Sequence, residues 1–264
     1  MKRLNHQEIK KIELNILLYF DAFCKRNKLR YYLAGGTLLG AVRHQGFIPW
    51  DDDVDVCMPR KDYNRLIKIF DNNSRFVLLS NQLNNSYFPF AKLTDSTTIV
   101  KAQYNEQETG LWIDILPVDG LPEDLDKVNK IYEKCDFYRK ILSLVDTKLG
   151  EGKTTYHKYA KYLLKPIANL YGGNRCSAVI EKIALSNPYD QSKYVGIVTW
   201  GLYGSGERML KSEFEASTSV LFEGHQFPAF SCWQSYLTGL YGNFMQLPPE
   251  EKRITHDMMV YMKD

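Results

Sequence analysis

The sequence predicts an α/β (α+β) protein in which helices flank a small mixed β-sheet. Three observations support this. Short strand-like apolar runs follow an amphipathic helix in the first 120 residues, helical spacing dominates from residue 123, and a strand-like run returns at residue 194. A chain of 264 residues can form one generous domain or two small ones. We expect a core over residues 1–122, a helical insertion over 123–190, and a C-terminal segment over 191–264 that completes the core and the site.

The first expected element is an amphipathic helix over residues 6–28. Its apolar side chains recur at spacings of three and four, and Asn5 with Glu8 resembles a capping box at its start. We expect the apolar stripe of this helix to pack against the sheet.

The stretch from residue 31 to 58 is expected to hold the chemistry. An apolar run over 31–34 leads into a Gly-Gly-Thr turn, a helix over 38–43, and a loop ending in aspartates at 51, 52, 53 and 55. Further along the chain we expect helices over 59–70, about 128–145 and 156–171, strands over 76–79, 87–100, 111–118 and 194–199, a hairpin loop over 101–110, and a helix break over 150–153.

Two aspartates alternate with valines at the end of this stretch. On a strand, Asp53 and Asp55 point to the same face while the intervening valines face the core, so their carboxylates repel each other. A divalent cation relieves such repulsion, and hard oxygen ligands favour Mg²⁺ or Mn²⁺ over zinc. Asp51 shares the alternation and could bind a second metal ion or accept a proton. Taken alone, an acidic run is usually a solvated loop or a cap.

The turn at Gly35, Gly36 and Thr37 leaves backbone N–H groups uncovered, and the following helix directs its N-terminus to the same place. A glycine pair alone is most often only a turn. Together with the acids about 15 to 20 residues downstream, it predicts a site for metal-assisted phosphate transfer.

Asp114 stands in an apolar strand, where an unpaired carboxylate is costly. We expect a third acid facing Asp53 and Asp55; the alternative is a strand-end aspartate that points to water. Lys92, on the preceding strand, could neutralise a substrate phosphate or be solvated. Arg43 could contact phosphate or simply end its helix, and His44 could make a structural or an acceptor-binding hydrogen bond.

Net charge, cysteine distribution and the length of apolar runs exclude or disfavour several classes of protein. A net charge of +3 does not suggest a nucleic-acid binder. Five scattered cysteines without a CxxC motif indicate neither a disulfide framework nor a zinc site and favour a reducing, cytoplasmic setting. Charged residues interrupt the apolar N-terminal positions, which excludes a signal peptide, and no run of 18 apolar residues predicts a transmembrane helix.

Two further features concern the surroundings of a site. The basic, aromatic helix over 156–171 could rest on an anionic membrane surface or be a solvated face over a core. Aromatic rings in the last third could cage a quaternary ammonium group or pack in the core, and Glu207 with Arg208 suggests a substrate-facing turn. The aromatic residues concerned are Trp200, Tyr203, Trp233, Tyr236 and Tyr241.

The run GGTLLGAVRHQGFIPWDDDVDV, residues 35–56, resembles the signature of the LicD family in the nucleotidyltransferase-fold superfamily. This family includes phosphocholine transferases and fukutin-type sugar-alcohol-phosphate transferases. Further similar pieces are FAKL at 90–93, WIDI at 112–115, YGN at 241–243 and LPPEEKR at 247–253. The resemblance is strong up to about residue 120 and from about 194 to 257, and weak between.

The resemblance implies a nucleotidyltransferase-like catalytic core that passes phosphocholine from CDP-choline to a sugar hydroxyl of a lipid-linked glycan precursor, such as teichoic acid or lipopolysaccharide, with release of CMP. It implies that Asp53 and Asp55 hold the metal ion and that Asp114 completes the metal site or acts as general base, a role that Asp51 could also take. One alternative is transfer of ribitol or glycerol phosphate from a CDP-activated donor. Another is a non-catalytic glycan-binding scaffold.

Overall fold

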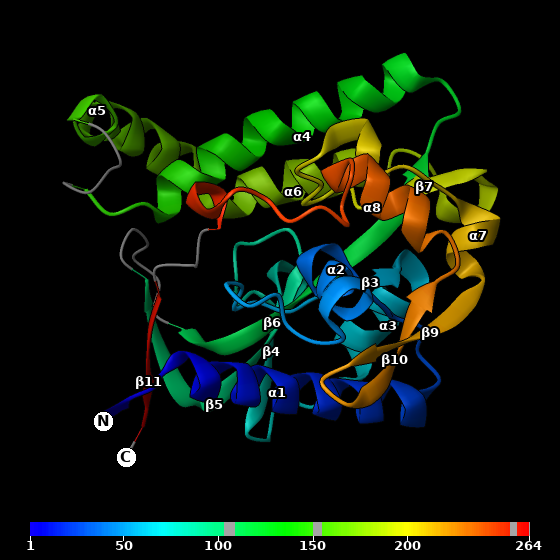
Figure 1. The fold of residues 1–264 in the computed structure, drawn as a ribbon. Coiled ribbons are helices and arrows are strands. Elements are labelled where there is room, and N and C mark those ends of the chain that lie inside the picture. The colour runs from blue at the N-terminus through cyan, green and yellow to red at the C-terminus, as the bar shows by residue number, and fades with distance from the viewer. Residues whose placement is uncertain (103–108, 150–154, 254–257, 264) are drawn as a thin grey trace.

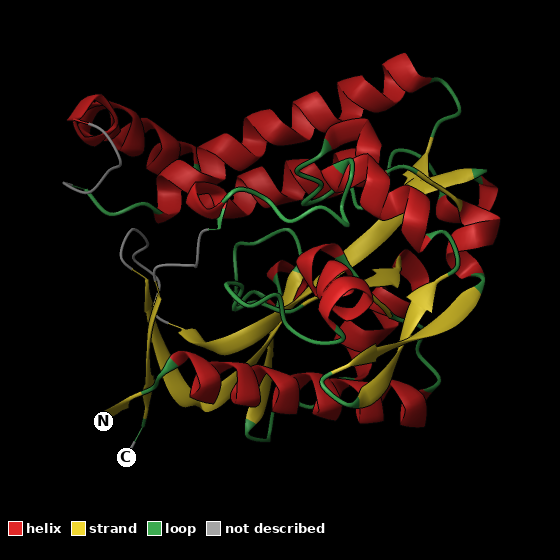
Figure 2. Ribbon diagram, in the orientation of Figure 1, coloured by secondary structure: helices red, strands yellow, loops and turns green. Residues whose placement is uncertain are grey.

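The computed structural model describes residues 1–264 except 103–108, 150–154, 254–257 and 264. Helix α1 runs along one side of the main sheet, and the helices of the insertion gather at the opposite side of the molecule (Figure 1). Figure 2 shows the strands between these two groups of helices. The predicted α/β class is confirmed.

The main sheet contains nine strands among the described residues, in the order β1-β11-β5-β6-β3-β2, with β4 paired to β5, β7 to β6 and β8 to β7. Its β3–β6 pair is parallel and its other described pairs are antiparallel, so the sheet is mixed as predicted. Strands β9 and β10 form a separate hairpin. The strands are β1 Lys2–Arg3, β2 Tyr32–Leu33, β3 Asp55–Pro59, β4 Phe76–Leu79, β5 Ala91–Ala102, β6 Thr109–Leu121, β7 Tyr194–Gly196, β8 Met209–Leu210, β9 Ser217–Phe222, β10 His225–Phe230 and β11 Met258–Met262.

Helices cover the sheet on both sides, and α4 packs against α5 and α6. The helices are α1 His6–Asn27, α2 Gly35–His44, α3 Arg60–Ile69, α4 Leu125–Asp146, α5 Thr155–Tyr171, α6 Gly173–Ala184, α7 Lys211–Glu215 and α8 Trp233–Tyr241. Short 3₁₀ turns are η1 Asn81–Leu83, η2 Tyr189–Gln191, η3 Gly204–Glu207 and η4 Glu250–Lys252.

The capping box predicted for α1 is present. The Asn5 side chain accepts a hydrogen bond from the Glu8 backbone at 3.0 Å, and the Asn5 backbone donates to the Glu8 carboxylate at 2.9 Å. These bonds satisfy two of the amides that a helix start leaves open. The apolar stripe of α1 then lies in the main core, as predicted.

One hydrophobic core takes residues from both ends of the chain. Its buried members run from Leu4 to Val118 and again from Val195 to Val260. A smaller core lies between α4, α6 and the ends of β6 and β7, and contains Leu121, Val128 and Ile180. The division into residues 1–122, 123–190 and 191–264 stays a prediction.

Several element boundaries differ from the expectation. Helix α2 begins at Gly35 rather than at residue 38, because Gly35 takes a backbone φ of +50° that turns the chain directly from β2 into the helix. Strand β3 begins at Asp55, so Asp53 lies just before it, and β5 begins at Ala91 rather than 87. The tip of the predicted 101–110 hairpin and the predicted helix break over 150–153 lie outside the described residues.

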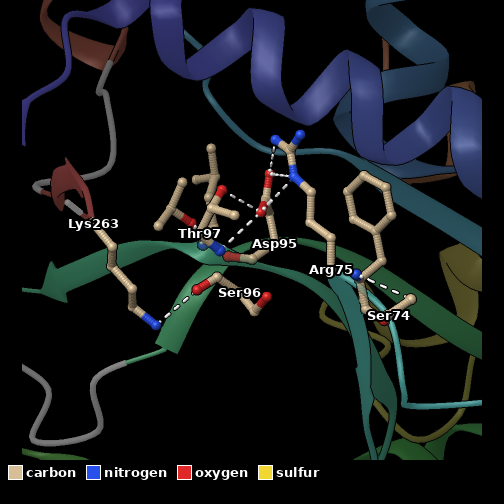
Figure 3. A network of polar contacts seen from close by, with 9 residues as sticks. Ser74, Arg75, Asp95, Ser96, Thr97 and Lys263 are labelled. Atoms are coloured by element: carbon tan, nitrogen blue, oxygen red, sulfur yellow. Dashed lines mark hydrogen bonds and ion pairs between the residues drawn. The ribbon is translucent and has the colours of Figure 1, made fainter.

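An ion pair fixes the irregular part of β5, where the register shifts between Asp95 and Val100. The fully buried Asp95 carboxylate receives two hydrogen bonds from Arg75 Nε at 3.0 Å, and Thr97 donates to it as well (Figure 3). Nearby, Lys263 Nζ donates to the Ser96 carbonyl at 2.7 Å. Burial alone raises the pKa of Asp95, but these donors more than offset it, so the pKa is lowered. The network holds the C-terminal end of the chain beside β5.

Candidate active site

A cavity of about 400 Å³ opens between the main sheet, the start of α2 and the C-terminal segment. Four aspartates predicted from the sequence line it together, and Glu207 is a fifth acid in its wall. The four aspartates are Asp51, Asp53, Asp55 and Asp114.

Strand register brings three of the predicted residues side by side. Asp55 on β3 lies opposite Asp114 on β6, and Asp114 lies opposite Lys92 on β5. Residues opposite each other in neighbouring strands point to the same face. Lys92 Nζ stands 3.0 Å from Asp114 Oδ1, so the predicted third acid is already paired with the predicted phosphate-binding lysine.

Aromatic rings surround the Lys92 ammonium group. It lies 4.1 Å from the centroid of the Trp112 ring, 4.9 Å from that of Phe88 and 5.3 Å from that of Phe90. Lys92 is buried, which strengthens its attraction both to the ring faces and to Asp114. The solvated alternative for Lys92 is therefore wrong.

The two predicted glycines place the helix start directly against the acids. A Cβ atom on Gly35 would lie 2.9 Å from Asp55 Oδ2, and one on Gly36 would lie 2.8 Å from Asp51 Oδ2. These contacts are closer than real Cβ atoms tolerate, so side chains at both positions would displace the carboxylates. The positive end of the α2 dipole thus faces the negative groups.

The Thr37 side chain is not part of the cavity lining, where the predicted phosphate-binding turn would place it. Its hydroxyl accepts a hydrogen bond from the Asp55 backbone N–H at 2.8 Å, and its side chain is buried beneath the cavity. Thr37 thereby fixes the position of Asp55. The Gly35 backbone N–H donates to the hydroxyl oxygen of Tyr236 at 3.3 Å, which ties α2 to α8.

Neighbouring carboxylates raise the proton affinity of Asp55. Burial, followed by the charges of Asp53, Asp114 and Asp51, raises the pKa of Asp55, while Lys92 opposes the shift. No three Asp, Glu, His or Cys side chains in the described part of the chain are arranged as a ready-made metal site. The aspartates therefore share one cavity without closing around a common point.

Arg43 and His44 lie outside the lining of this cavity. Arg43 Nε donates to His44 Nε2 at 2.9 Å, and Arg43 Nη1 donates to the Phe244 carbonyl at 2.8 Å. Burial, and then the Arg43 charge, lowers the pKa of His44. The pair connects α2 to the C-terminal segment, and a phosphate or acceptor contact by either residue stays a prediction.

Four of the five aromatic residues singled out in the last third line the cavity, namely Trp200, Tyr203, Tyr236 and Tyr241. Trp233 instead packs against Phe244 with a ring-centroid distance of 6.3 Å. Arg208 turns away from the cavity, because its guanidinium stacks 3.4 Å from the centroid of the Tyr194 ring.

Sequence reasoning missed Trp112 as a wall of the cavity. The signal was present, because Trp112 precedes Asp114 by two residues on the same strand and so shares its face.

A second surface lies on α5, whose described side chains are arranged with the apolar face outward. Tyr159, Leu163, Ile167 and Leu170 are 65%, 76%, 66% and 89% exposed. Lys165, one of the basic residues of this helix, is buried and donates to the Thr147 carbonyl at 2.7 Å. This lysine closes the junction between α4 and α5. No helix in the described ranges is long and apolar enough to cross a membrane.

Comparison with known proteins identifies relatives for nearly the whole chain. The family described as LicD/FKTN/FKRP, nucleotidyltransferase domain, matches residues 28–149. The lipopolysaccharide cholinephosphotransferase LicD of Haemophilus influenzae is 31% identical over 263 residues, which cover 97% of each chain.

Two other relatives match over shorter stretches. Mannosyltransferase regulator 4 of Saccharomyces cerevisiae is 31% identical over 122 residues, or 42% of this chain and 10% of that protein. Human ribitol 5-phosphate transferase FKRP is 64% identical over 28 residues, or 11% of this chain and 6% of that protein. With an end-to-end relative and a matching family domain over its acidic cavity, this chain belongs to the LicD/FKTN/FKRP nucleotidyltransferase family.

Proposed function

We propose that the chain transfers phosphocholine from CDP-choline to a sugar hydroxyl of a cell-surface glycan precursor and releases CMP. The observation that carries this proposal is the single cavity in which aspartates, a glycine-lined helix start and aromatic rings meet. The relative from Haemophilus influenzae, named a lipopolysaccharide cholinephosphotransferase, supports phosphocholine as the transferred group and lipopolysaccharide as acceptor. Teichoic acid is the alternative acceptor.

A Mg²⁺ or Mn²⁺ ion fits the oxygen-only donor set of the cavity. We propose that Asp53 and Asp55 hold it and that Asp114 completes the set. The raised pKa of Asp55 supports this assignment, because neighbouring carboxylates that resist ionisation together are stabilised by a cation. When bound, the ion would offset negative charge on the donor's diphosphate.

The remaining groups position the reactants. The N–H groups at Gly35, Gly36 and Thr37 are proposed to hold the diphosphate at the start of α2, where the diphosphate would replace the Tyr236 hydroxyl as acceptor of the Gly35 N–H. Lys92 is proposed to neutralise the transferred phosphate. In an in-line displacement, the acceptor oxygen forms a bond to phosphorus while the bond from phosphorus to the CMP oxygen breaks. The acceptor proton passes to Asp51, or to Asp114 if Asp114 is not a ligand of the ion. Positioning and electrostatics supply nearly all the acceleration in such reactions.

The exposed face of α5 supports action at a membrane. Tyrosine and leucine side chains at helical spacing bind the boundary between lipid headgroups and acyl chains without crossing it. We propose that this face rests on the inner face of the membrane, on the cytoplasmic side, and brings the cavity to a lipid-linked acceptor.

A different donor alcohol is the second candidate. The short match to ribitol 5-phosphate transferase favours ribitol phosphate, and glycerol phosphate has the same chemistry. A non-catalytic glycan-binding scaffold is a third possibility, but it would not require four aspartates in one cavity.

A panel of CDP-activated alcohols tests these alternatives. The purified chain is incubated with CDP-choline, CDP-ribitol or CDP-glycerol, a glycan acceptor and Mg²⁺, and CMP is measured by mass spectrometry. Release of CMP from CDP-choline in preference to the other donors supports the proposal. Preference for ribitol or glycerol moves the chain to the second candidate, and release from none supports the scaffold.

A further inference from the structure

Glu207 places a buried and only partly paired carboxyl group in the wall of the cavity. Glu207 ends the 3₁₀ turn η3, lines the cavity and is only 3% exposed. Its Oε1 accepts a hydrogen bond from the Tyr203 backbone N–H at 3.4 Å, whereas its Oε2 has no hydrogen-bond partner in the part of the chain that the structure describes. A buried carboxylate without full pairing is costly, so this wall is suited to a cationic ligand.

Aromatic rings lie in the same wall. Tyr203 and Tyr241 both line the cavity and meet edge to face, with ring centroids 5.2 Å apart. Trp200 lines it too and packs against Phe90 at 5.0 Å. Aromatic faces beside a carboxylate attract a quaternary ammonium group, which cannot donate conventional hydrogen bonds and is held by ring faces and charge.

We propose that Glu207, Trp200, Tyr203 and Tyr241 form the subsite for the quaternary ammonium group of the donor. This inference rests on the proposed phosphocholine transfer and adds to it the residues that select the donor. The acids and glycines at the start of α2 take the phosphates, so the two walls of the cavity take the two ends of one phosphocholine group. A polyol such as ribitol would instead require several hydrogen-bonding partners.

A purely structural role for Glu207 is the competing explanation. The Tyr132 and Arg139 side chains of α4 lie close enough to Glu207 to interact with its charge. Loss of a structural carboxylate would lower kcat/KM equally for every donor. Loss of a cation-binding carboxylate would lower kcat/KM only for the donor that carries the quaternary ammonium group.

The test compares CDP-choline with its neutral isostere, the CDP ester of 3,3-dimethylbutanol, in which carbon replaces nitrogen. The wild type should prefer CDP-choline by about 30-fold in kcat/KM, as expected from a desolvated cation–π contact, and Glu207→Gln should reduce this preference to about threefold or less. An unchanged preference in Glu207→Gln, or no preference in the wild type, overturns the subsite.

Binding of choline alone separates this inference from the proposed function. Isothermal titration calorimetry should detect binding of choline by the wild type and not by Glu207→Gln, whether or not CMP is released. Choline binding without CMP release keeps the subsite and removes the transferase proposal. CMP release from CDP-choline with equal choline binding by both proteins does the reverse.

A second pair of variants tests the rings. Tyr203 is 45% exposed, so its replacement leaves the core intact. Tyr203→Leu should lower kcat/KM for CDP-choline by about 10-fold or more, and Tyr203→Phe, which keeps the ring, by about threefold or less. Equal losses in the two variants would show that ring faces do not contribute.

Discussion

Asp55 is buried in a position where several negative charges meet. It lies opposite Asp114 in the sheet, under the bare Cα of Gly35, and close enough to Asp53 and Asp51 for their charges to raise its pKa. The alternation of acids and valines predicted this convergence. The Lys92–Asp114 pair could not be predicted, because its register depends on the irregular hairpin between β5 and β6.

Replacing Asp55 should stabilise the metal-free protein. Asp55→Asn removes one of several repelling charges and keeps the shape of the side chain, so the free energy of unfolding should rise by about 1 to 2 kcal/mol at pH 7.5 in EDTA. Urea denaturation measures this change. A less stable variant would show that the carboxylate serves mainly as a structural acceptor.

In the absence of a cationic ligand, Glu207 should make the free energy of unfolding fall as pH rises, whereas a bound cation would favour the ionised carboxylate. Burial raises its pKa to about 8, so the folded state binds a proton that the unfolded state releases near pH 4.5. Stability contributed by this proton is present below the unfolded pKa and is lost up to about pH 8, on the order of 4 kcal/mol. The charged or titratable groups that face Glu207 are Arg139, Tyr132, Tyr203, Tyr236, Tyr241 and Cys57.

The measurement is urea unfolding of wild type and Glu207→Gln from pH 5 to pH 9. Other groups titrate equally in both proteins, so the difference isolates Glu207. Relative to the wild type, the free energy of unfolding of the variant should rise from pH 5 to about pH 8 and level off by pH 9, and parallel profiles would contradict the assignment.

At the scale of elements, the start of α2 limits the space available to the Asp55 and Asp51 side chains. Gly35 has a positive φ and no room for a Cβ beside Asp55, whereas Gly224 has a φ of +78° in open space. Gly35→Ala and Gly224→Ala should each cost about 1 to 2 kcal/mol of stability from backbone strain. Only Gly35→Ala should also lower kcat/KM, by at least about tenfold, because it displaces Asp55.

Urea unfolding and CMP release on the two glycine variants provide the check. Equal activity in both variants would show that the contact between α2 and Asp55 is not needed for the reaction.

The outward apolar face of α5 belongs to the same scale. Leu163→Gln with Leu170→Gln should abolish flotation with liposomes of zwitterionic and anionic phospholipid, because each leucine inserts most of its side chain. The matched control is Leu125→Gln with Leu185→Gln, two leucines 52% and 49% exposed on other elements. Equal flotation by both double variants would remove the membrane proposal.

At the scale of the whole molecule, a buried ion network joins the core to the insertion. Arg60 donates to both oxygens of the buried Asp119 at 2.6 and 2.7 Å and to Glu181 of α6 at 2.7 Å. Arg60→Met should lower the free energy of unfolding by about 3 to 5 kcal/mol, because it leaves Asp119 buried and uncompensated.

The double variant Arg60→Met, Asp119→Leu removes both charges of the fully buried pair and leaves only the 25% exposed Glu181 without Arg60, so it should recover most of that stability. Urea unfolding measures both proteins. A double variant as unstable as Arg60→Met would show that packing, rather than the stranded charge, accounts for the loss.

The sequence predicted local structure and local chemistry better than long-range contacts. Periodicity and the capping box located α1, Pro59 marked the start of α3, and alternation placed Asp53 and Asp55 in one cavity. The ion network of Arg60, Asp119 and Glu181 joins residues up to 121 positions apart, which no local pattern reports. The outward face of α5 was equally hidden, because a helical pattern shows which residues share a face but not which face is buried.

The most direct measurement is the rate of CMP release from CDP-choline by wild type and Asp55→Asn, in Mg²⁺ and in EDTA. We predict release by the wild type in Mg²⁺, and a loss of at least about 1,000-fold both in EDTA and in the variant. Retention of more than about a tenth of the wild-type rate by a folded Asp55→Asn protein would contradict the assignment of this cavity as a metal-assisted phosphotransfer site.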